Sequence, residues 1–596
     1  MAHAQKTIRL TVAQALVKYI AAQYSVADGV RERFIPAAFG IFGHGNVAGL
    51  GQALDEFNDE LPFIQGRNEQ ALAHAAIAFA KAKRRRQALA VTASIGPGAL
   101  NMVTAAGLAT VNRLPVLLLP GDTYATRRQG PVLQQIEDPS APDITANDAF
   151  RPVSRFFDRI TRPEQLLTAL PQAFRVLANP VETGAVVIAL PQDIQSHAHD
   201  YPVEFFEPHD WKIRRPQPEA EDVRTVAEIL RSAKKPLIIA GGGVVYSGAT
   251  AELEALANAT GIPVAETFGG KGAIQNPGPW HVWGIGLEGS PETNRLVEQA
   301  DVILHVGTRL TDFATASQSL FHNPNVRFVS LNVSEFDGVK QGAATIVADA
   351  KVGLAALTAE VSGYRVPAEW TAEIAERQSR WVAMRAAAID PDVLFPKTAE
   401  HDPDGTDAII TQGQMLGVMQ EHARDGDILI AGAGGSSRRR PEGVGCDERA
   451  ICPSRIRILV HGLRTTCRHR SSIRRARPSS PRHDVYRRRN VPHGSNRTRH
   501  GGSRRPPADN RYLREPRLSG HPTTPDVARW TPLRQRVPIS RPGEERGQPG
   551  RIKQQRGTPR GRIPRRRPCG GRPRTRSART SGSDRRRVPH CPQRHA

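Results

Sequence analysis

The chain has 596 residues, which is enough for about three or four domains, and a formal net charge of +24. That charge alone would suggest a nucleic-acid or membrane partner. However, residues 438–596 hold 44 Lys and Arg against 10 Asp and Glu, a net charge of +34, whereas residues 1–437 hold 38 against 48, a net charge of −10. The basic character therefore belongs to the last part of the chain, and the first 437 residues are mildly acidic.

Cysteine is distributed in the same uneven way. All five cysteines follow Ser437: Cys446, Cys452, Cys467, Cys569 and Cys591. Their irregular spacing matches no zinc pattern, and a long stretch without cysteine fits a reducing compartment. The N-terminus lacks the apolar run of a signal peptide, and the apolar stretch "RLPVLLLPG" is too short to cross a bilayer. We therefore expect a cytoplasmic protein with no membrane partner.

Residues 1–195 alternate helical stretches with short apolar runs that end in Gly, Pro or Asp. The runs in "RERFIPAAFGIFGHGNVAG", "RRRQALAVTASIGPGALN", "RLPVLLLPGDTY" and "ETGAVVIALPQDI" each predict a buried strand followed by a loop. Between the first two, "NEQALAHAAIAFAKAKRRR" has apolar residues at helical spacing. This alternation indicates an α/β domain with a parallel sheet.

A second α/β unit is predicted over residues 215–365, with strands in "KKPLIIAGGGVV", "GIPVAET", "ADVILHVGTRL" and "VRFVSLNVS". A third unit begins at residues 405–437, as a helix and then a strand. The pattern stops at Arg438, after which 43 Arg accompany a single Lys, Lys553, and no Phe. Such a composition cannot bury enough apolar surface to offset the entropy of ordering, so residues 438–596 are expected to be disordered.

Four motifs could contribute to a site. In "GIFGHGNVAGLG", residues 40–51, Asn46 could donate to a ligand, although a tight strand-to-helix turn would also explain the glycines. In "QGRNEQALAHAA", Glu69 begins a helix, where a carboxylate also interacts favourably with the helix dipole. His74, one turn later, is interpreted as a packing residue.

The other two motifs are also rich in glycine. "TASIGPGALNMVTA", residues 92–105, predicts a strand, a Gly-Pro-Gly loop and a helix start, an arrangement that can hold a polar ligand through backbone N–H groups. "LIIAGGGVVYSGA", residues 237–249, lacks the GxGxxG spacing and the following acidic residue of a dinucleotide site, so no nucleotide is predicted there.

The combination of these pieces is more specific than any one of them. In their order, "GIFGHGNVAGLGQALDE", "FIQGRNEQALAHAAIAFAKA", "SIGPGALNMVTAAGLATVNRLPVLLLPGD" and "RRQGPVLQQIEDP" resemble the thiamine-diphosphate-dependent enzymes, and among them the ring-opening dione hydrolases of myo-inositol catabolism. The resemblance extends to about residue 436. It implies three parallel-sheet domains: a pyrimidine-binding domain at 1–195, a central domain at 215–365, and the start of a diphosphate-binding domain at 405–437.

The resemblance also assigns roles. Glu69 matches the glutamate that hydrogen-bonds the cofactor's pyrimidine ring, so it is the expected catalytic and cofactor-binding residue; such a carboxyl group needs a pocket that tunes its proton exchange. Residues 96–98 would lie near the pyrimidine, and Gln134 or Gln135 would face the reaction centre. The implied cofactors are thiamine diphosphate and Mg²⁺. The implied reaction opens trihydroxycyclohexane-1,2-dione to 5-deoxy-glucuronate in a homodimer or homotetramer.

The Mg²⁺ site of this family uses Gly-Asp-Gly followed by an Asn about thirty residues later, because the ion requires oxygen ligands. No such pair follows Gly435, so no metal ligand is assigned. With suitable codons and a one-nucleotide shift, "RRRPEGVGCD" becomes PGDVLKAWDA, "RIRILVHGLRTTCRH" becomes AFEFSCMGYELPAA, and "YRRRNVPHGSNRTR" becomes TGDGTYLMAPTEL. We infer that the reading frame slips near Ser437, and we expect this chain to have little or no activity.

Two other functions are alternatives. The first is a 2-oxo acid carboligase or decarboxylase similar to acetolactate synthase, which an assay with pyruvate would distinguish. The second is a nucleic-acid-binding protein whose Arg-rich tail contacts phosphates. The tail has only three aromatic residues for base stacking: Tyr486, Tyr512 and Trp530. Nucleic-acid binding is therefore expected to be adventitious only.

Overall fold

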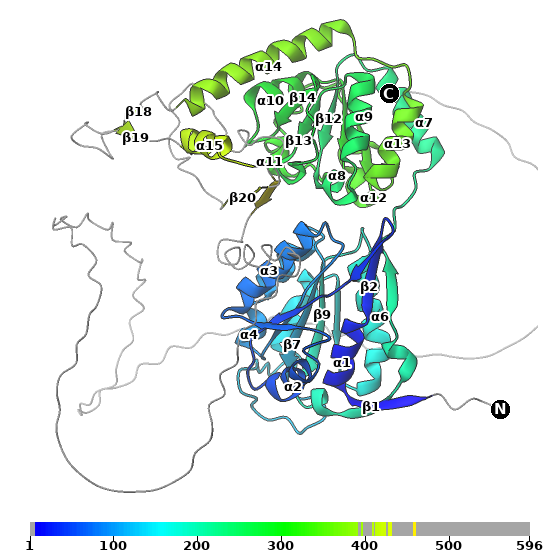
Figure 1. The fold of residues 1–596 in the computed structure, drawn as a ribbon, viewed down its shortest axis with the longest axis vertical. Helices are drawn as coiled ribbons and strands as arrows, with labels where there is room; N and C mark the ends of the chain where they lie inside the picture. The colour runs from blue at the N-terminus through cyan, green and yellow to red at the C-terminus, as the bar shows by residue number, and fades with distance from the viewer. Residues whose placement is uncertain are drawn as a thin grey trace, which may run out of the picture. The chain divides into compact units, whose positions relative to one another are not determined.

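The computed structural model describes residues 6–390 and five short segments: 395–396, 408–409, 412–424, 427–431 and 457–460. All of these belong to one compact unit, Met1–Asp484. Its strands form two six-stranded parallel sheets, each covered by helices (Figure 1). The predicted α/β class with parallel sheets is therefore confirmed.

The first sheet has the strand order β5-β4-β6-β7-β9-β8, and every neighbouring pair is parallel. Its strands are β4 (Ala38–Gly40), β5 (Phe63–Gln65), β6 (Ala90–Ala93), β7 (Val116–Asp122), β8 (Phe156–Arg159) and β9 (Ala185–Pro191). Every residue of β7 and β9 is buried. Continuous burial of this kind is typical of a parallel sheet with both faces covered.

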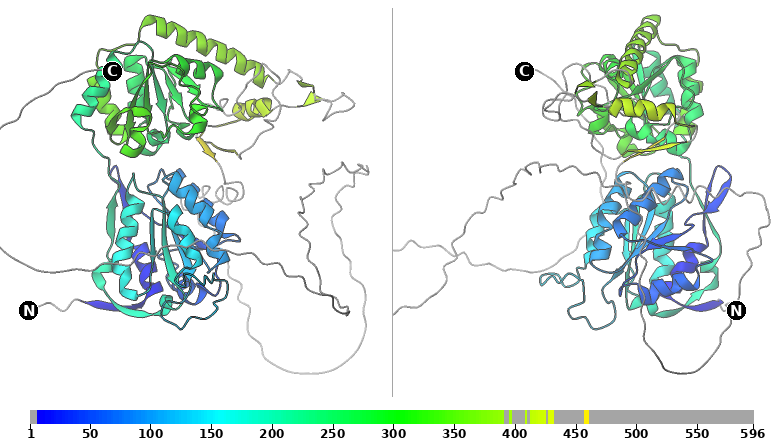
Figure 2. Two further views of the ribbon diagram at one scale, coloured as in Figure 1. Left: turned by 180° about the vertical axis from the view of Figure 1, so that it is seen from behind. Right: turned by 60° about the vertical axis from the view of Figure 1, so that its left-hand side comes forward.

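Helices lie on both faces of this sheet (Figure 1, Figure 2). One face packs against α1 (Val12–Ala21), α2 (Gln52–Glu56) and α6 (Leu166–Ala178). The other packs against α3 (Glu69–Ala82), α4 (Pro97–Leu100) and α5 (Val103–Val111). The helix starts follow local capping rules: Thr11 and Gln14 form a reciprocal capping box at α1, and the Asn68 side chain accepts from the Ala71 N–H, 2.8 Å away, at α3.

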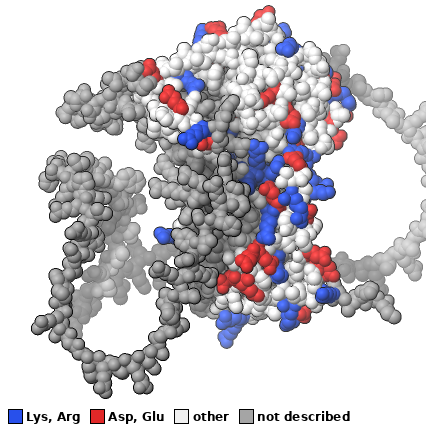
Figure 3. Space-filling view, viewed as in Figure 1, with Lys and Arg blue, Asp and Glu red and all other residues white. Residues whose placement is uncertain are grey.

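Two smaller sheets flank the first core. β1 (Thr7–Thr11) pairs antiparallel with β10 (Ala198–Pro202). β2 (Gln23–Ala27) lies between its hairpin partner β3 (Val30–Arg33) and β11 (His209–Lys212). Figure 3 shows Lys and Arg side chains gathered around the β2–β3 hairpin. Arg31 there is 2.7 Å from Asp210, an exposed pair that water screens and that contributes little to stability.

The second sheet has the order β14-β13-β12-β15-β16-β17 and is also wholly parallel. Its strands are β12 (Pro236–Ala240), β13 (Val264–Glu266), β14 (His281–Gly284), β15 (Val302–Val306), β16 (Arg327–Asn332) and β17 (Ala344–Val347). One face packs against α7 (Ala220–Arg231), α9 (Thr250–Thr260) and α13 (Ala350–Glu360). The other packs against α10 (Pro291–Gln299) and the long α14 (Ala368–Ile389).

The glycine run after β12 has a packing explanation. α8 (Gly242–Ser247) begins where the backbone passes close to the end of β15. A Cβ added to Gly241 would lie 2.5 Å from the carbonyl oxygen of Gly307. A Cβ added to Gly243 would lie 2.6 Å from the Cα of Gly307. The run therefore permits close backbone contact between the end of β12 and the end of β15.

The remaining described segments follow α14. β18 (Phe395–Pro396) pairs with β19 (Ala408–Ile409), α15 is Gln412–Glu421, and β20 (Ile428–Ala431) pairs in parallel with β21 (Arg457–Val460). β21, with the sequence "RILV", lies within the predicted tail at 438–596, and the expectation of disorder there stays a prediction. The rest of the predicted tail lies outside the described residues.

Within the part of the chain that the structure describes, no helix has the length and apolar character that a membrane span requires. The strands of the first sheet all lie within the predicted 1–195 domain, and those of the second within 215–365. The domain limits themselves stay predictions.

Candidate active site

The candidate site lies at the carboxyl edge of the first sheet. The loops after β4, β5 and β6 lead into residues 41–51, Glu69 and residues 94–98, and these three strands are neighbours in the order β5-β4-β6. The carboxyl ends of parallel strands meet at one edge, which is where ligands bind in open α/β sheets. The sheet topology therefore brings together three of the motifs that the sequence pointed to.

Glu69 is the first residue of α3 and is half-buried. Its Oε2 accepts a hydrogen bond from Asn101 Nδ2, 2.9 Å away. Its Oε1 lies beside Gly98, where an added Cβ would be only 3.3 Å away. The carboxylate is thus oriented by an amide on one oxygen, while the glycine leaves space beside the other.

The Gly-Pro-Gly loop is in close contact with a second loop. Gly96 has φ of +59° and is the N-cap of α4. A Cβ at this position would be 1.7 Å from the carbonyl oxygen of Gln134, so only glycine fits here. Gln134 itself has φ of +65°, a conformation that non-glycine residues adopt rarely and at some energetic cost.

The two glutamines of this second loop differ. The side chain of Gln134 is exposed, whereas that of Gln135 is half-buried. The Oε1 of Gln135 accepts a long hydrogen bond of 3.4 Å from the N–H of Ala146, and its buried Nε2 has no hydrogen-bond partner among the described residues. Gln135 therefore has a free amide donor within the loop that contacts the Gly-Pro-Gly motif.

Asp193, just beyond β9, holds the start of this loop in place. Its carboxylate accepts hydrogen bonds from the backbone N–H groups of Ala125, Thr126 and Arg127 at 3.0, 2.8 and 2.9 Å, and from the Thr126 hydroxyl at 2.9 Å. Burial alone would raise the pKa of Asp193, but the hydrogen bonds from these donors lower it to about 2. The ionised carboxylate is therefore part of the loop's structure.

Asn46 has a structural role instead of the ligand-binding role considered above. It is 2% exposed, accepts from the Gly43 N–H at 2.9 Å, and donates to the Ile41 carbonyl at 3.2 Å and the Thr92 hydroxyl at 3.0 Å. The tight-turn interpretation therefore holds, because the amide is already satisfied within the loop. His74 is 9% exposed and burial lowers its pKa, as suits a packing residue.

Two sequence families match this chain. "Thiamine pyrophosphate enzyme, N-terminal TPP binding domain" matches residues 21–141, and "Thiamine pyrophosphate enzyme, central domain" matches residues 223–357. Over 440 residues the chain is 49% identical to a 3D-(3,5/4)-trihydroxycyclohexane-1,2-dione hydrolase of Geobacillus thermodenitrificans, covering 72% of this chain and 68% of that protein. The chain belongs to the thiamine-pyrophosphate-dependent enzyme family.

Other relatives in this family carry the same printed name. The chain is 46% identical over 442 residues to 3D-(3,5/4)-trihydroxycyclohexane-1,2-dione hydrolase 2 of Bacillus cereus, and 45% identical over 442 residues to a hydrolase of that name from Bacillus anthracis. Each match covers 72% of this chain and 68% of the relative. The resemblance inferred from the motifs is therefore confirmed at the level of the family.

The cofactor of this thiamine enzyme family is thiamine diphosphate, and the residues around Glu69 fit its pyrimidine end. The missing Cβ of Gly98 leaves a gap beside the carboxylate, and Asn101 holds the carboxylate from the other side. For the diphosphate end, no group of three or more His, Cys, Asp or Glu among the described residues could hold a metal ion. The region after Gly435, where Gly-Asp-Gly was expected, lies outside the residues that the structure describes.

Sequence reasoning missed two residues of this site. Asn101 gave no signal of its own, although it follows the Gly-Pro-Gly loop by one helical turn. Asp193 follows the end of β9, a position where polar residues often serve a site in parallel sheets. A search for polar residues just past each buried strand would have selected Asp193, but its partners lie 66 to 68 residues away in the sequence.

Proposed function

We propose that the in-frame form of this enzyme is a thiamine-diphosphate- and Mg²⁺-dependent hydrolase that opens trihydroxycyclohexane-1,2-dione to 5-deoxy-glucuronate in myo-inositol catabolism. The observation that carries the proposal is the pairing of Glu69 with Asn101 beside Gly98. Identities of 45–49% to hydrolases of this name supply the substrate. The net reaction adds one water molecule across a ring C–C bond.

In this proposal Glu69 shares a proton with a ring nitrogen of the bound pyrimidine. Asn101 fixes the orientation of the carboxylate by donating to Oε2, so that Oε1 is left for the ring. When bound, thiamine diphosphate supplies the electron sink that C–C cleavage requires. Gln135 would donate its free amide toward the substrate, while its loop, packed on Gly96, limits the access of bulk water.

We further propose that the Mg²⁺ and diphosphate ligands are encoded after Gly435 in the shifted frame, in the stretch that becomes TGDGTYLMAPTEL. Mg²⁺ neutralises a diphosphate through oxygen ligands, which an Arg-rich segment does not provide. The chain with the present sequence would therefore not hold its cofactor firmly and would have little or no activity. The in-frame enzyme would be a homodimer or homotetramer with each site formed by two subunits.

The test begins with the DNA across codons 430–445. A one-base correction there should open a long frame containing Gly-Asp-Gly, and the resulting protein should consume the cyclic dione but not pyruvate. Activity on pyruvate alone would instead indicate a carboligase or decarboxylase. If no single-base change opens a frame, or if the uncorrected chain turns over the dione at the corrected rate, the proposal of a slipped frame is wrong.

The role of Glu69 is tested in the corrected enzyme. Glu69→Gln should lower kcat by at least about 100-fold, because proton transfer by a positioned carboxyl group contributes that much. The matched control is Glu182→Gln. Glu182 is exposed, pairs with Arg175, and precedes β9 at the opposite edge of the sheet, so its loss should leave kcat within about twofold. Equal effects of the two variants would contradict the assignment.

A further inference from the structure

Arg159 connects two strands of the first sheet that are not neighbours. It is the last residue of β8, at the carboxyl edge that also carries Glu69 and the Gly-Pro-Gly loop. Its Nε lies 2.8 Å from Oδ2 of Asp122, the last residue of β7, and β9 lies between these two strands in the sheet. Asp122 is fully buried, and the Arg159 side chain is 19% exposed. The ion pair therefore fixes one end of the guanidinium, while its other end reaches a different element.

That other end holds the cap of a short 3-10 helix, η2 (Ala146–Val153). Nη2 of Arg159 donates to Oδ2 of Asp148 at 2.8 Å and to Oγ1 of Thr145 at 2.9 Å. The same two oxygens form the capping box of η2, because Asp148 accepts from the Thr145 N–H at 2.7 Å and Thr145 accepts from the Asn147 N–H at 3.1 Å. One guanidinium nitrogen therefore contacts both acceptor oxygens of the cap.

This cap lies against Gln135, the loop residue with the free amide donor. The first N–H of η2, that of Ala146, donates to Oε1 of Gln135 at 3.4 Å. A hydrogen bond of this length is weak, so the orientation of the amide depends on where the cap holds the Ala146 N–H. The Nε2 of Gln135 has no partner in the described part of the chain. The contacts therefore run from Asp122 through Arg159 and the cap to a donor that is left for a ligand.

Neutralising the charge of Asp122 explains only half of this arrangement. A buried carboxylate requires a cation beside it, and a lysine ammonium could supply that charge. A lysine could not supply the planar fork of Arg159, in which Nε faces Asp122 and Nη2 faces the cap of η2. The stability of the sheet therefore does not account for the contact with the cap.

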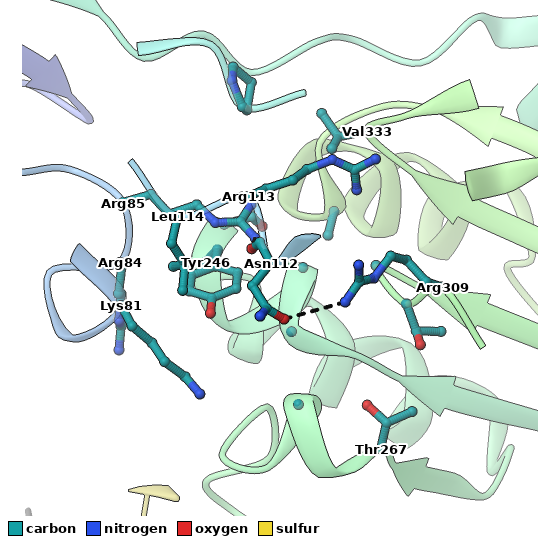
Figure 4. A pocket seen from close by; sticks show the side chains of 18 of the residues that line it. Lys81, Arg84, Arg85, Asn112, Arg113, Leu114, Tyr246, Thr267, Arg309 and Val333 are labelled. Atoms are coloured by element: carbon teal, nitrogen blue, oxygen red, sulfur yellow. Dashed lines mark hydrogen bonds between the residues drawn. The ribbon is translucent and has the colours of Figure 1, made fainter. Parts of the chain in front are cut away.

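A cavity of about 610 Å³ does not account for this contact either. Its lining includes Lys81, Arg85, Tyr246 and Arg309, whose side chains are drawn in Figure 4. Neither Arg159 nor any of its partners lines this cavity. The network of Arg159 therefore belongs to the edge of the first sheet, where the candidate active site lies.

We propose that Arg159 is a positioning residue of the hydrolase, which holds the cap of η2 so that the Gln135 amide donates to an oxygen atom of the bound substrate. The proposal rests on the function proposed above, in which Gln135 faces the cyclic dione. Carbonyl and hydroxyl oxygens of such a substrate accept the hydrogen bond that Nε2 offers. Arg159 acts through the cap and not through a contact of its own with the substrate.

The first arm of the test uses the full chain with its present sequence and needs no cofactor. Arg159→Lys keeps a positive charge beside Asp122 but cannot bridge the strand and the cap. It should speed amide hydrogen exchange at residues 145–148 at least about tenfold, as measured by mass spectrometry. The control is Arg377→Lys, because Arg377 is 18% exposed and bridges Glu292 and Glu373 in the second core. The control should leave exchange at residues 145–148 unchanged.

The second arm uses the corrected, in-frame enzyme and a double-mutant cycle. Arg159→Lys should lower kcat/KM for the cyclic dione at least about tenfold, since a misplacement of about 1 Å can cost that much. In a Gln135→Ala background the same change should cost less than about twofold, because the group that Arg159 positions is gone. Thr145→Val leaves the Arg159–Asp122 pair intact and should show the same dependence on Gln135. Arg377→Lys should leave kcat/KM within about twofold.

The outcomes separate this role from the proposed function. An equal loss of kcat/KM with and without Gln135 would mean that Arg159 is structural only, and the hydrolase function would stand. Unchanged exchange at residues 145–148 would mean that the guanidinium does not hold the cap, which overturns the proposal at any level of activity. A corrected enzyme that does not consume the dione with Arg159 and Gln135 both in place would refute the proposed function itself.

Discussion

Asp193 offers a quantitative test of how the candidate site is held together. Lowering its pKa from 3.8 to about 2 corresponds to about 2.5 kcal/mol in favour of the folded loop at neutral pH. Because the pKa is lower in the folded state, this stabilisation is complete above about pH 4 and is lost as the pH falls through about 2. At pH 3, about half of it remains.

The perturbation is Asp193→Asn, which preserves the shape but removes the charge and one acceptor. Amide hydrogen exchange at residues 125–127, followed by mass spectrometry, reports the loop directly. The variant should exchange about 60-fold faster than the wild type at pH 7 and about tenfold faster at pH 3. Asp200→Asn is the control, because Asp200 forms an exposed pair with Arg9 and its loss should change exchange by less than about twofold.

Either of two results would refute this role of Asp193. An increase of less than about threefold at pH 7 would mean that the backbone donors do not depend on the charge of Asp193. An increase that stays the same at pH 3 would mean that the ionised carboxylate is not what the loop requires.

Three further predictions concern the loop, the junction between the two sheets and the second core. Gly96→Ala should destabilise the protein by about 2–4 kcal/mol in urea unfolding, because a side chain at φ of +59° is strained and meets the Gln134 carbonyl oxygen. The control Gly130→Ala places its Cβ in open space, so it should leave the free energy of unfolding nearly unchanged. Arg113→Met should lower the free energy of unfolding by about 3 kcal/mol, because the buried Asp337 would lose one of its two cationic partners. An unchanged free energy of unfolding would mean that Lys340 alone is sufficient for Asp337. Leu354→Ala, at a fully buried position of α13, should lower the free energy of unfolding by about 2–5 kcal/mol, and a loss below about 1 kcal/mol would contradict the packing described.

Much of the central architecture could be predicted from the sequence, because four strands of each parallel sheet are short apolar runs that a turn residue follows, whereas β5, β8, β14 and β17 were not predicted. "VLLLPGD" and "AVVIALP" are wholly buried, as such runs require. The flanking strands β1, β10 and β11 were not predicted, since they are partly exposed and pair with residues nearly 200 positions away, for example Thr7 with Pro202. Local patterns carry no information about such pairings.

The candidate site, like the fold, could be predicted from the sequence only in part. Glu69 and the Gly-Pro-Gly loop could be found from motif and order, but the use of Asn46 inside its own loop could not, because the sequence does not show where an amide's partners lie. The short strand β21 shows the opposite limit. Composition over a long window predicts disorder for the tail as a whole, and it gives no sign of a short segment such as Arg457–Val460 that pairs with β20.

Each parallel sheet is built from one continuous stretch of chain, β4–β9 from residues 38–191 and β12–β17 from residues 236–347. Among the residues that the structure describes, neither sheet takes a strand from the other or from beyond residue 347. A ribosome adding about 5–20 residues per second needs roughly 10–40 s to make the 206 residues after residue 390, which is ample time for both cores to form first. Both cores therefore have time to form before most of the Arg-rich segment is made, and no described strand of either parallel sheet has to wait for that segment.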